Sequence, residues 1–518
     1  MPQLKQPPPL KFIVLQSLQR YIQTLGQDLL REVCSGASGI IPSTRSGMPS
    51  YPAEERNHKF YKLEELQQFL QPGLPLPLSN EVTSAILEAI TTLISQAKCT
   101  YDGFSKSGDD SCREIIEKLI SAALHDHITR VDLLQWPWII GEILLKNLEK
   151  FQHLEDLKFC PTSWGPLWIT VVERMENGCY SLENLVSFSM RCHCTDKILQ
   201  VMAYCTRLKY LDVMSSVEVT DTCVSSVLQM KNLKVINVWS TSLTADGYIK
   251  LLIGLPHLSK LAWFDLNSQV LARMKTSPLS LQNYEASRVS ADQLIIMVQM
   301  CPYLKQVSFH KVEADLSVLG TLKHLREIKI TQCNAVNSNL KGLLAIVGYN
   351  ITSLELYEVG DVDLLMIGVL CVNLKRMGLI CEFQSSDSSF LGIKAPLFKE
   401  LEDLRFGSKY SECLFFNCTN IRKLEISRCD NLNDDVFAEL LRRNPLKQLQ
   451  LLSICHSGRL SMNTVYLLLD SCDKLRVLEG LDSWGGITKS QVMELCTEMK
   501  RRNMDIEILW KKPLTISW

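Results

Sequence analysis

The sequence predicts an α/β solenoid, in which strand–turn–helix units stack along one axis and a parallel sheet lines the inner side. The first observation is an apolar phrase, Leu-x-x-Leu-x-apolar, that returns at intervals of roughly 20 to 31 residues. Its plainest copies begin at Leu208, Leu233, Leu304, Leu325, Leu401 and Ile421. Weaker copies begin at Leu154, Leu185, Leu258, Leu281, Ile351, Leu374, Leu446 and Leu475. A unit of this size cannot bury its own apolar face, so it becomes stable only when it stacks on neighbours.

The second observation is that the spacing of apolar residues changes between the phrases. Within a phrase, the fourth and sixth residues share one face of a strand, because strand side chains alternate with a period of two. Between phrases, apolar residues lie three and four apart, which is typical of helices, at 221–228, 246–252 and 434–441. The residues positioned to cap these helices are Thr220, Thr244 and Asn433. The chain is therefore a leucine-rich repeat protein, expected to form a right-handed horseshoe with the parallel sheet on its concave face.

The segment before the repeats predicts a small α-helical head. Apolar residues recur at helical spacing over 10–33, 63–70, 80–97 and 113–124. The first, imperfect strand of the repeats is expected at 128–134. We therefore predict two domains, a helical head at 1–126 and a repeat domain at 127–518.

Composition narrows the classes of function. The chain of 518 residues has a formal net charge of −1, which gives no general attraction for nucleic acid or an anionic membrane. No apolar run is long enough to span a bilayer, and no secretion signal opens the sequence. We expect a cytoplasmic protein, with the nucleus as the alternative, that binds other proteins and neither nucleic acid nor membranes.

Cysteines recur in register with the repeats. Five of the 19 cysteines precede their phrase by three residues: Cys205, Cys301, Cys371, Cys418 and Cys472. Small apolar thiols suit tightly stacked turns, so packing explains them. This pattern resembles the cysteine-containing repeats of F-box/leucine-rich-repeat proteins, which are substrate receptors of cullin ubiquitin ligases.

Two patterns in the head resemble adaptor-binding boxes. The stretch from Pro9, with Leu10, Val14 and Leu18 at four-residue steps, is similar to the elongin-binding box, although that family usually has Cys where this chain has Val14. A second pattern resembles the cullin-selecting box and comprises Leu74, Pro75, Leu78 and Val82. An exposed apolar helix face of this kind can dock in a groove of an adaptor. Packing of the same residues in the core of the head is the competing interpretation.

The order of these features resembles the N-terminal half of the Zyg-eleven/Zer-one receptors. The resemblance implies elongin B/C and a cullin as partners and an unknown protein as substrate. Two departures are the long separation between the boxes and the lack of armadillo-type repeats before Trp518. An F-box that binds a Skp-type adaptor is an alternative for the segment at Leu76, and a scaffold unconnected to ubiquitin is another.

No catalytic or cofactor motif is present. Phosphate-binding and dinucleotide-binding glycine loops and the His-Glu-x-x-His zinc motif are all missing from the sequence, so we expect no enzyme and no cofactor. Cys192, His193 and Cys194 could hold zinc, but the spacing on a strand disfavours it and we predict no metal site.

The seventh residue of each phrase should lie on the concave face, where neighbouring strands are about 5 Å apart. Large side chains recur in this column and have no core to fill, so we predict that they bind a protein substrate. They are Met214, Trp239, Phe264, His310 and Tyr357. The competing interpretation is that the loop at 266–280, or the C-terminal tail with Trp510 and Trp518, covers this patch.

Overall fold

The computed structural model confirms the leucine-rich repeat solenoid with helices at its N-terminal end. It describes residues 10–38, 61–70, 76–100, 110–134, 136–160, 167–177, 182–262, 267–274, 278–381, 397–407, 417–427 and 432–511. Two compact units divide at residues 258 and 259, so that the first comprises Pro8–Leu258 and the second contains Ser259–Trp518. This division falls inside the repeats, and the boundary between residues 126 and 127 stays a prediction.

The N-terminal helices of the first unit pack around an apolar core. They are α1 (Leu10–Ser38), α3 (Tyr61–Leu70), α4 (Leu76–Thr100) and α5 (Asp110–Ala123). Fully buried isoleucines and leucines fill the space between them, among them Ile22, Ile86, Ile90 and Leu119. Helix α4 begins four residues earlier than the predicted start at Asn80, because a proline in the first helical turn sacrifices no intrahelical hydrogen bond.

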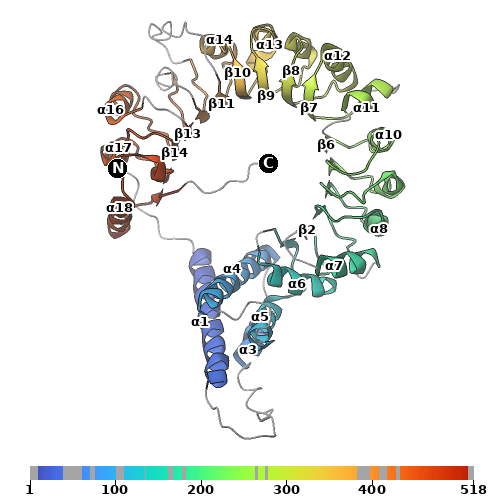
Figure 1. The fold of residues 1–518 in the computed structure, drawn as a ribbon, viewed down its shortest axis with the longest axis vertical. Coiled ribbons are helices and arrows are strands. Elements are labelled where there is room, and N and C mark those ends of the chain that lie inside the picture. The colour runs from blue at the N-terminus through green and yellow to red at the C-terminus, as the bar shows by residue number, and fades with distance from the viewer. Residues whose placement is uncertain are drawn as a thin grey trace. The chain divides into compact units, whose positions relative to one another are not determined.

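The repeats of the first unit follow directly. Their strands are β1 (Arg130–Asp132), β2 (Asp156–Phe159), β3 (Ser187–Met190), β4 (Tyr210–Asp212) and β5 (Val235–Asn237), each parallel to the next. The outer elements include α6 (Trp138–Lys146), α7 (Leu167–Glu176), α8 (Asp196–Val201), α9 (Val224–Val227) and α10 (Ala245–Gly254). Helices lie on one side of the strands in this unit (Figure 1).

The second unit continues the same pattern. Its strands are β6 (Lys260–Ala262), β7 (Asn283–Val289), β8 (Gln306–Val312), β9 (Glu327–Asn334), β10 (Ser353–Gly360), β11 (Arg376–Ile380), β12 (Asp403–Phe406), β13 (Lys423–Ser427), β14 (Leu451–Cys455), β15 (Val477–Glu479) and β16 (Glu507–Leu509). Strands β7 to β16 form one sheet in chain order. The helices outside it are α11 (Asn267–Arg273), α12 (Ala291–Met300), α13 (Leu340–Val347), α14 (Leu364–Leu370), α16 (Asp434–Arg443), α17 (Met462–Ser471) and α18 (Lys489–Arg501).

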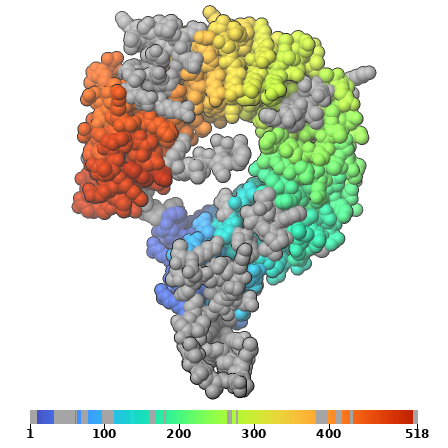
Figure 2. Space-filling model, viewed as in Figure 1, coloured from blue at the N-terminus to red at the C-terminus, as the bar shows by residue number. Residues whose placement is uncertain are grey.

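Equivalent positions of successive phrases lie side by side in the sheets. Leu211 pairs with Ile236, and Leu424 pairs with Leu452, with all four side chains buried. One predicted phrase was out of register: β14 places Leu452 and Ile454 inward, so the phrase begins at Leu449 rather than Leu446. The prediction was wrong because Leu446, Leu449, Leu451 and Leu452 let both registers satisfy the apolar pattern. Side chains fill the space between successive repeats within each unit (Figure 2).

A left-handed residue recurs near the C-terminal end of many of the strands. The residue at position eight of the phrase has φ between 53° and 75° in eight repeats: Cys192, Ser215, Ser240, Arg288, Lys311, Gln332, Glu358 and His456. This conformation is uncommon outside glycine, and none of the eight is glycine. In this conformation the backbone amide can donate a hydrogen bond to the next repeat. The Ser215 amide, for example, donates to the carbonyl of Trp239 at 2.8 Å. The stacking of repeats thus holds a turn that the local sequence would not favour.

The predicted caps and cysteine positions are confirmed. Thr220, Thr244 and Asn433 accept backbone amide hydrogens at the starts of their helices. The five cysteines in register are buried, and burial raises the pKa of Cys205 to about 11 and that of Cys301 to about 12. Such thiols stay protonated at neutral pH and serve the packing of turns.

Candidate protein-interaction surfaces

Helix α1 changes character along its length. Its second half is buried among the N-terminal helices, with Ile22 and Leu25 in the core. Its first turns instead expose large apolar side chains: Leu10, Phe12, Ile13 and Val14 are each between 45% and 76% exposed. A helix that served only the core would place such residues inward, so this end presents an apolar surface to solvent.

The described parts of the two predicted boxes lie at the same end of the α1–α4 pair. Lys11 forms an ion pair of 2.5 Å with Glu81, and Gln19 donates to Glu88 at 2.7 Å. Gln27 extends the series by donating to Gln96 at 3.0 Å, so the two helices run parallel. The start of α1 therefore lies beside the start of α4, where the second box ends.

The box residues differ in accessibility. Leu10 and Val14 are exposed, whereas Leu18 and Leu78 are half-buried. Val82 is only 8% exposed, so it serves the core of the helices in this arrangement. Leu74 and Pro75 lie outside the described residues.

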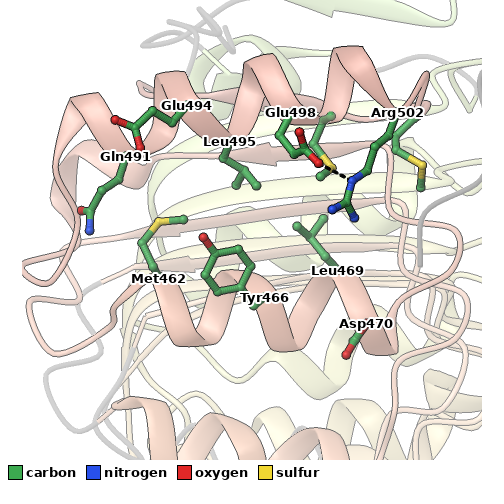
Figure 3. Close-up of a pocket in the computed structure, with 11 residues that line it drawn as sticks. Met462, Tyr466, Leu469, Asp470, Gln491, Glu494, Leu495, Glu498 and Arg502 are labelled. Atoms are coloured by element: carbon green, nitrogen blue, oxygen red, sulfur yellow. Dashed lines mark hydrogen bonds and ion pairs between the residues drawn. The ribbon is translucent and has the colours of Figure 1, made fainter.

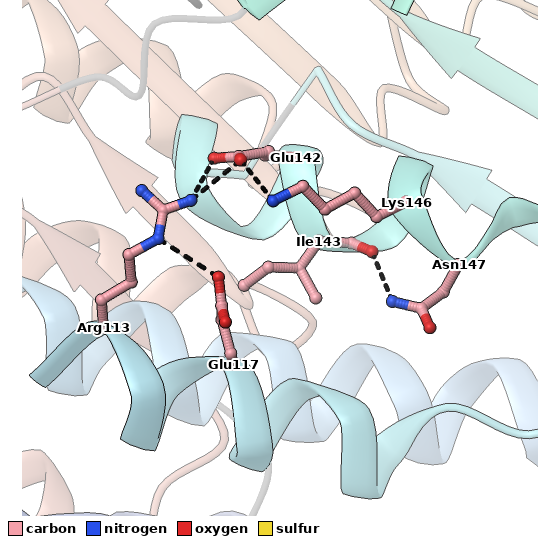
Figure 4. A network of polar contacts seen from close by, with 6 residues as sticks. All are labelled: Arg113, Glu117, Glu142, Ile143, Lys146 and Asn147. Atoms are coloured by element: carbon pink, nitrogen blue, oxygen red, sulfur yellow. Dashed lines mark hydrogen bonds and ion pairs between the residues drawn. The ribbon is translucent and has the colours of Figure 1, made fainter. Parts of the chain in front are cut away.

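A polar network joins α5 to the first outer helix of the repeats (Figure 4). The Arg113 guanidinium donates to both carboxylate oxygens of Glu142 at 2.8 Å and to Glu117 at 3.2 Å. Lys146 pairs with the same Glu142 carboxylate at 2.8 Å. Glu142 is nearly buried, and two cations satisfy its charge there. The contacts fix α5 to α6 and so hold the N-terminal helices against the repeats of this unit.

The concave face of the first unit carries three large apolar side chains at position seven of the phrase: Leu134, Met214 and Trp239. Each is held by the same turn, in which the position-five side chain accepts the position-seven amide hydrogen. Asp132 accepts from Leu134 at 3.1 Å, and Asn237 accepts from Trp239 at 3.2 Å. Asp212 does the same for Met214 and also accepts two hydrogen bonds from Arg191. Leu134 was not among the predicted residues, because its phrase, beginning at Ile128, is irregular.

The structure does not bring all five predicted concave residues into one patch. Phe264 lies outside the described residues, and His310 and Tyr357 belong to the second unit. His310 is half-buried beside Ser287 and Thr331, its register partners on β7 and β9. Met214 and Trp239, on adjacent repeats of the first unit, remain together.

Tyr357 lies at the centre of a charged cluster on the second unit. A Cβ added to Gly378 would meet its hydroxyl oxygen at 2.8 Å, so the ring lies over the neighbouring strand where glycine leaves room. The Lys329 ammonium stands 5.6 Å from the ring centroid. Burial, and secondarily the charge of Glu355, raise the pKa of Tyr357 to about 12. The ring is therefore held by packing and a cation and does not stand free like an apolar anchor.

Ion pairs continue along this face. Arg405 lies 3.6 Å from both Asp403 and Glu425, and Lys423 lies 2.8 Å from Glu425. The sequence indicates this cluster by charged residues at positions three and five of two successive phrases, those that begin at Leu401 and Ile421. Charged side chains thus surround Tyr357 on the concave face of the second unit, although Ile380, its register partner on β11, is 42% exposed.

The cysteine–histidine cluster does not assemble a metal site. Cys194 is fully buried, and burial raises the pKa of its thiol well above its usual value, while Cys192 occupies the left-handed turn. Across the described ranges, no group of three or more His, Cys, Asp or Glu side chains is placed to hold a metal ion. Nor does any helix in these ranges combine the length and apolar character needed to cross a membrane.

The sequence matches no family model and no curated protein. Solved structures with a similar backbone include a chain of the yeast Rad7–Elc1 complex, which is 13% identical with a TM-score of 0.42 over 79% of this chain and 92% of that chain. An internalin of Listeria monocytogenes is 12% identical with a TM-score of 0.30 over 70% and 81% of the two chains. A leucine-rich repeat protein of Leptospira interrogans is 13% identical with a TM-score of 0.28 over 74% and 93%.

Proposed function

We propose that this chain is a non-catalytic protein-interaction subunit that serves as a substrate receptor of a cullin-RING ubiquitin ligase. The observation that carries the proposal is the exposed apolar start of α1, formed by Leu10, Phe12, Ile13 and Val14. Leu10 and Val14 are also the residues that match the elongin-binding box. An elongin B/C adaptor is the proposed occupant of this surface.

An exposed apolar helix face adds affinity when a partner covers it and removes it from water. Leu10, Ile13 and Val14 are spaced three and four residues apart, so they share one helix face and form the kind of anchor set that an amphipathic helix places in a groove. Burying such a side chain fully contributes about 1.5–3 kcal/mol each, before the entropic cost of association. The rest of α1 is fixed by the core, so little further ordering opposes docking.

The cullin contact is a second part of the proposal. The contacts of Lys11 with Glu81 and of Gln19 with Glu88 support this part, because they hold the start of α1 beside the start of α4, where Leu78 lies. Val82 is buried, so we assign the contact to the half-buried Leu78 rather than to the Val82 side chain. The resemblance to the Zyg-eleven/Zer-one receptors points the same way.

The substrate is proposed to bind the concave face of the first unit at Met214 and Trp239. The Trp239 amide donates to the Asn237 side chain, which fixes the backbone there, and the indole is 39% exposed. A large side chain is therefore available to a ligand. Trp239→Ala should weaken binding of an identified substrate by more than tenfold. An unchanged affinity with an intact fold would remove Trp239 from the site.

The adaptor assignment is tested by co-purification. The full chain is mixed separately with purified elongin B/C and with a purified Skp-type adaptor, and each mixture is resolved by size-exclusion chromatography. Co-elution with elongin B/C alone supports the proposal. Co-elution with the Skp-type adaptor would favour an F-box-like receptor, and co-elution with neither would favour a scaffold unconnected to ubiquitin.

A further inference from the structure

Two acidic residues of the described ranges, Glu142 and Glu479, are more than nine-tenths buried, and they differ in their partners. Glu142 on α6 is matched by Arg113 and Lys146. Glu479, the last residue of β15, is 7% exposed, and no described residue forms a hydrogen bond or ion pair with its carboxylate. A buried charge without a partner is costly in any fold, so this residue requires a physical explanation.

The residue beside Glu479 also lacks a partner. Ser453 on β14 is the register partner of Glu479, and both occupy position five of their phrases, on the concave face of the second unit. Ser453 is 1% exposed, and its hydroxyl oxygen is buried without a hydrogen bond to any described group. Neighbouring strands are about 5 Å apart. Two unsatisfied polar side chains therefore lie side by side on this face.

The same sheet shows how an internal partner is built. Glu425, also at position five, lies 2.8 Å from Lys423 at position three of its own strand and 3.6 Å from Arg405 at position five of the preceding strand. Around Glu479 these two positions hold Val477 and the unsatisfied serine. Neither side chain can carry a positive charge, so the repeat of Glu479 supplies no cation of its own at these positions.

A carboxylate on the outer helices gives a second comparison. Glu498 lines an opening between α17 and α18, and the Arg502 side chain reaches it there (Figure 3). Arg502 donates to Glu498 at 2.5 Å, and Arg501 donates to the same carboxylate at 2.8 Å. These bonds hold the pKa of Glu498 down to about 2. Glu498 is matched within the chain although it is more exposed than Glu479.

The charges on the adjoining elements favour a cation at Glu479. Asp482, on the short helix η9 (Leu481–Ser483), and Glu507 on β16 are exposed, and neither forms an ion pair in the described part of the chain. Lys511, which follows β16, is also exposed and pairs with none of these three carboxylates. The nearest elements thus leave a local excess of negative charge.

The end of β15 is held firmly in place. The Trp484 indole N–H donates to the carbonyl of Ile454 on β14 at 2.9 Å, and the Ser483 hydroxyl donates to the same carbonyl at 3.4 Å. Trp484 is itself 2% exposed. A carboxylate on such a fixed strand end needs little ordering before it binds a ligand.

We propose that Glu479 binds a lysine side chain of a partner protein on the concave face of the second unit. The ammonium donates to the Glu479 carboxylate, with the Ser453 hydroxyl on the neighbouring strand as a second acceptor. A lysine suits a carboxylate that is only 7% exposed, because its charge stands at the end of a slender apolar stem. This site lies on a different unit from Met214 and Trp239, so it does not rest on the ubiquitin-ligase proposal.

The probe for this site is n-butylammonium, the side-chain analogue of lysine, with n-butanol as the neutral control and the ionic strength held constant. Saturation-transfer difference NMR on the full chain should show saturable binding of n-butylammonium and at least tenfold weaker binding of n-butanol. Glu479→Gln should lower the affinity for n-butylammonium at least tenfold. Glu313→Gln, which removes an exposed carboxylate just after β8, should leave it unchanged. No saturable binding by the wild-type chain, or equal losses in the two variants, would overturn the proposal.

An engineered internal cation gives an independent test. Val477→Lys places a lysine where Lys423 stands relative to Glu425, so it should occupy Glu479, raise the midpoint of thermal unfolding and weaken n-butylammonium at least tenfold. Val235→Lys, at position three of a phrase that has Asn237 at position five, should have neither effect. Unchanged probe affinity in a folded Val477→Lys chain would contradict the assignment.

Thermal unfolding of Glu479→Gln distinguishes an external partner from an internal one. Glutamine keeps the shape of the side chain and removes its charge, so the midpoint of unfolding should equal or exceed that of the wild type. A clearly lower midpoint would mean that a group within the chain already satisfies the carboxylate, and it would overturn the proposal.

Discussion

Asp221 accepts hydrogen bonds from Thr244, the residue that caps the outer helix of the next repeat. The Thr244 amide donates to one carboxylate oxygen at 2.8 Å, and its hydroxyl donates to the other. Asp196 binds Thr220 in the same way, and Asp434 binds Ser461. One acidic residue in the first turn of a helix thus fixes the start of its neighbour, and this link repeats along the stack.

Asp221→Ala should destabilise the first unit, because two donors of Thr244 lose their charged acceptor. We expect a loss of about 1.5–3 kcal/mol in the free energy of unfolding, measured by chemical denaturation. Glu173→Ala, at an exposed acidic position of α7, should change stability by less than about 0.5 kcal/mol. Equal effects of the two substitutions would show that the link contributes nothing specific.

Glu142→Ala should likewise destabilise the junction between α5 and α6. Arg113 and Lys146 would lose a shared, nearly buried carboxylate, and we expect a loss of about 1.5–3 kcal/mol. Glu114 pairs with Lys118 on the surface of α5, and Glu114→Ala should cost only about 0.3–0.5 kcal/mol. Thermal unfolding of the two variants compares them directly, and a smaller loss for Glu142→Ala than for Glu114→Ala would contradict the account.

Lys311→Gly should leave the second unit as stable as before or more stable. Lys311 has φ of 56°, a conformation that costs a residue with a side chain about 1–2 kcal/mol and glycine almost nothing. Lys305→Gly, at an exposed position of the same repeat without positive φ, should instead destabilise by about 0.5–1 kcal/mol. The denaturant midpoint of Lys311→Gly should therefore equal or exceed that of the wild type, and the midpoint of Lys305→Gly should be lower. Equal midpoints of the two variants would contradict strain at Lys311.

His125 should make stability depend on pH. Burial, and then the neighbouring His127, lower its pKa, while Asp126 and the hydrogen bond with Ser79 act in the opposite direction; its ring also contacts Thr83 on α4. Because the folded pKa lies below the unfolded value of about 6.5, the contribution is fully present above that value and is lost as the pH falls from there through the folded pKa. His125→Asn should therefore show a smaller stability loss than wild type between pH 7.5 and 5.5 by denaturant titration. A larger loss in the variant would contradict this assignment.

Much of the fold could be predicted because the repeat imposes two periods on one sequence. The inward residues Leu211 and Ile236 and the caps Thr220 and Thr244 follow from period and residue type alone. The register at Leu449 could not be predicted, since a run of leucines fits two alignments equally. The left-handed turns were also hidden, because residues such as Lys311 and Glu358 have no local preference for them and adopt them through contacts with the next repeat.

The candidate surfaces were less predictable than the fold. Exposure of Leu10 and Val14 could be distinguished from burial of Val82 only in three dimensions, because all three belong to amphipathic helices with similar spacing. Tyr357 has the position of an apolar anchor in the sequence, yet Gly378 and Lys329 from neighbouring strands enclose it.

The most direct measurement is the affinity of the full chain for purified elongin B/C by isothermal titration calorimetry, with and without the double substitution Leu10→Ser and Val14→Ser. Both residues are exposed, so the folded structure should survive, as circular dichroism would verify. We expect saturable binding by the wild-type chain and an affinity at least tenfold lower in the variant. No binding by the wild-type chain, or equal affinity of both chains, would contradict it.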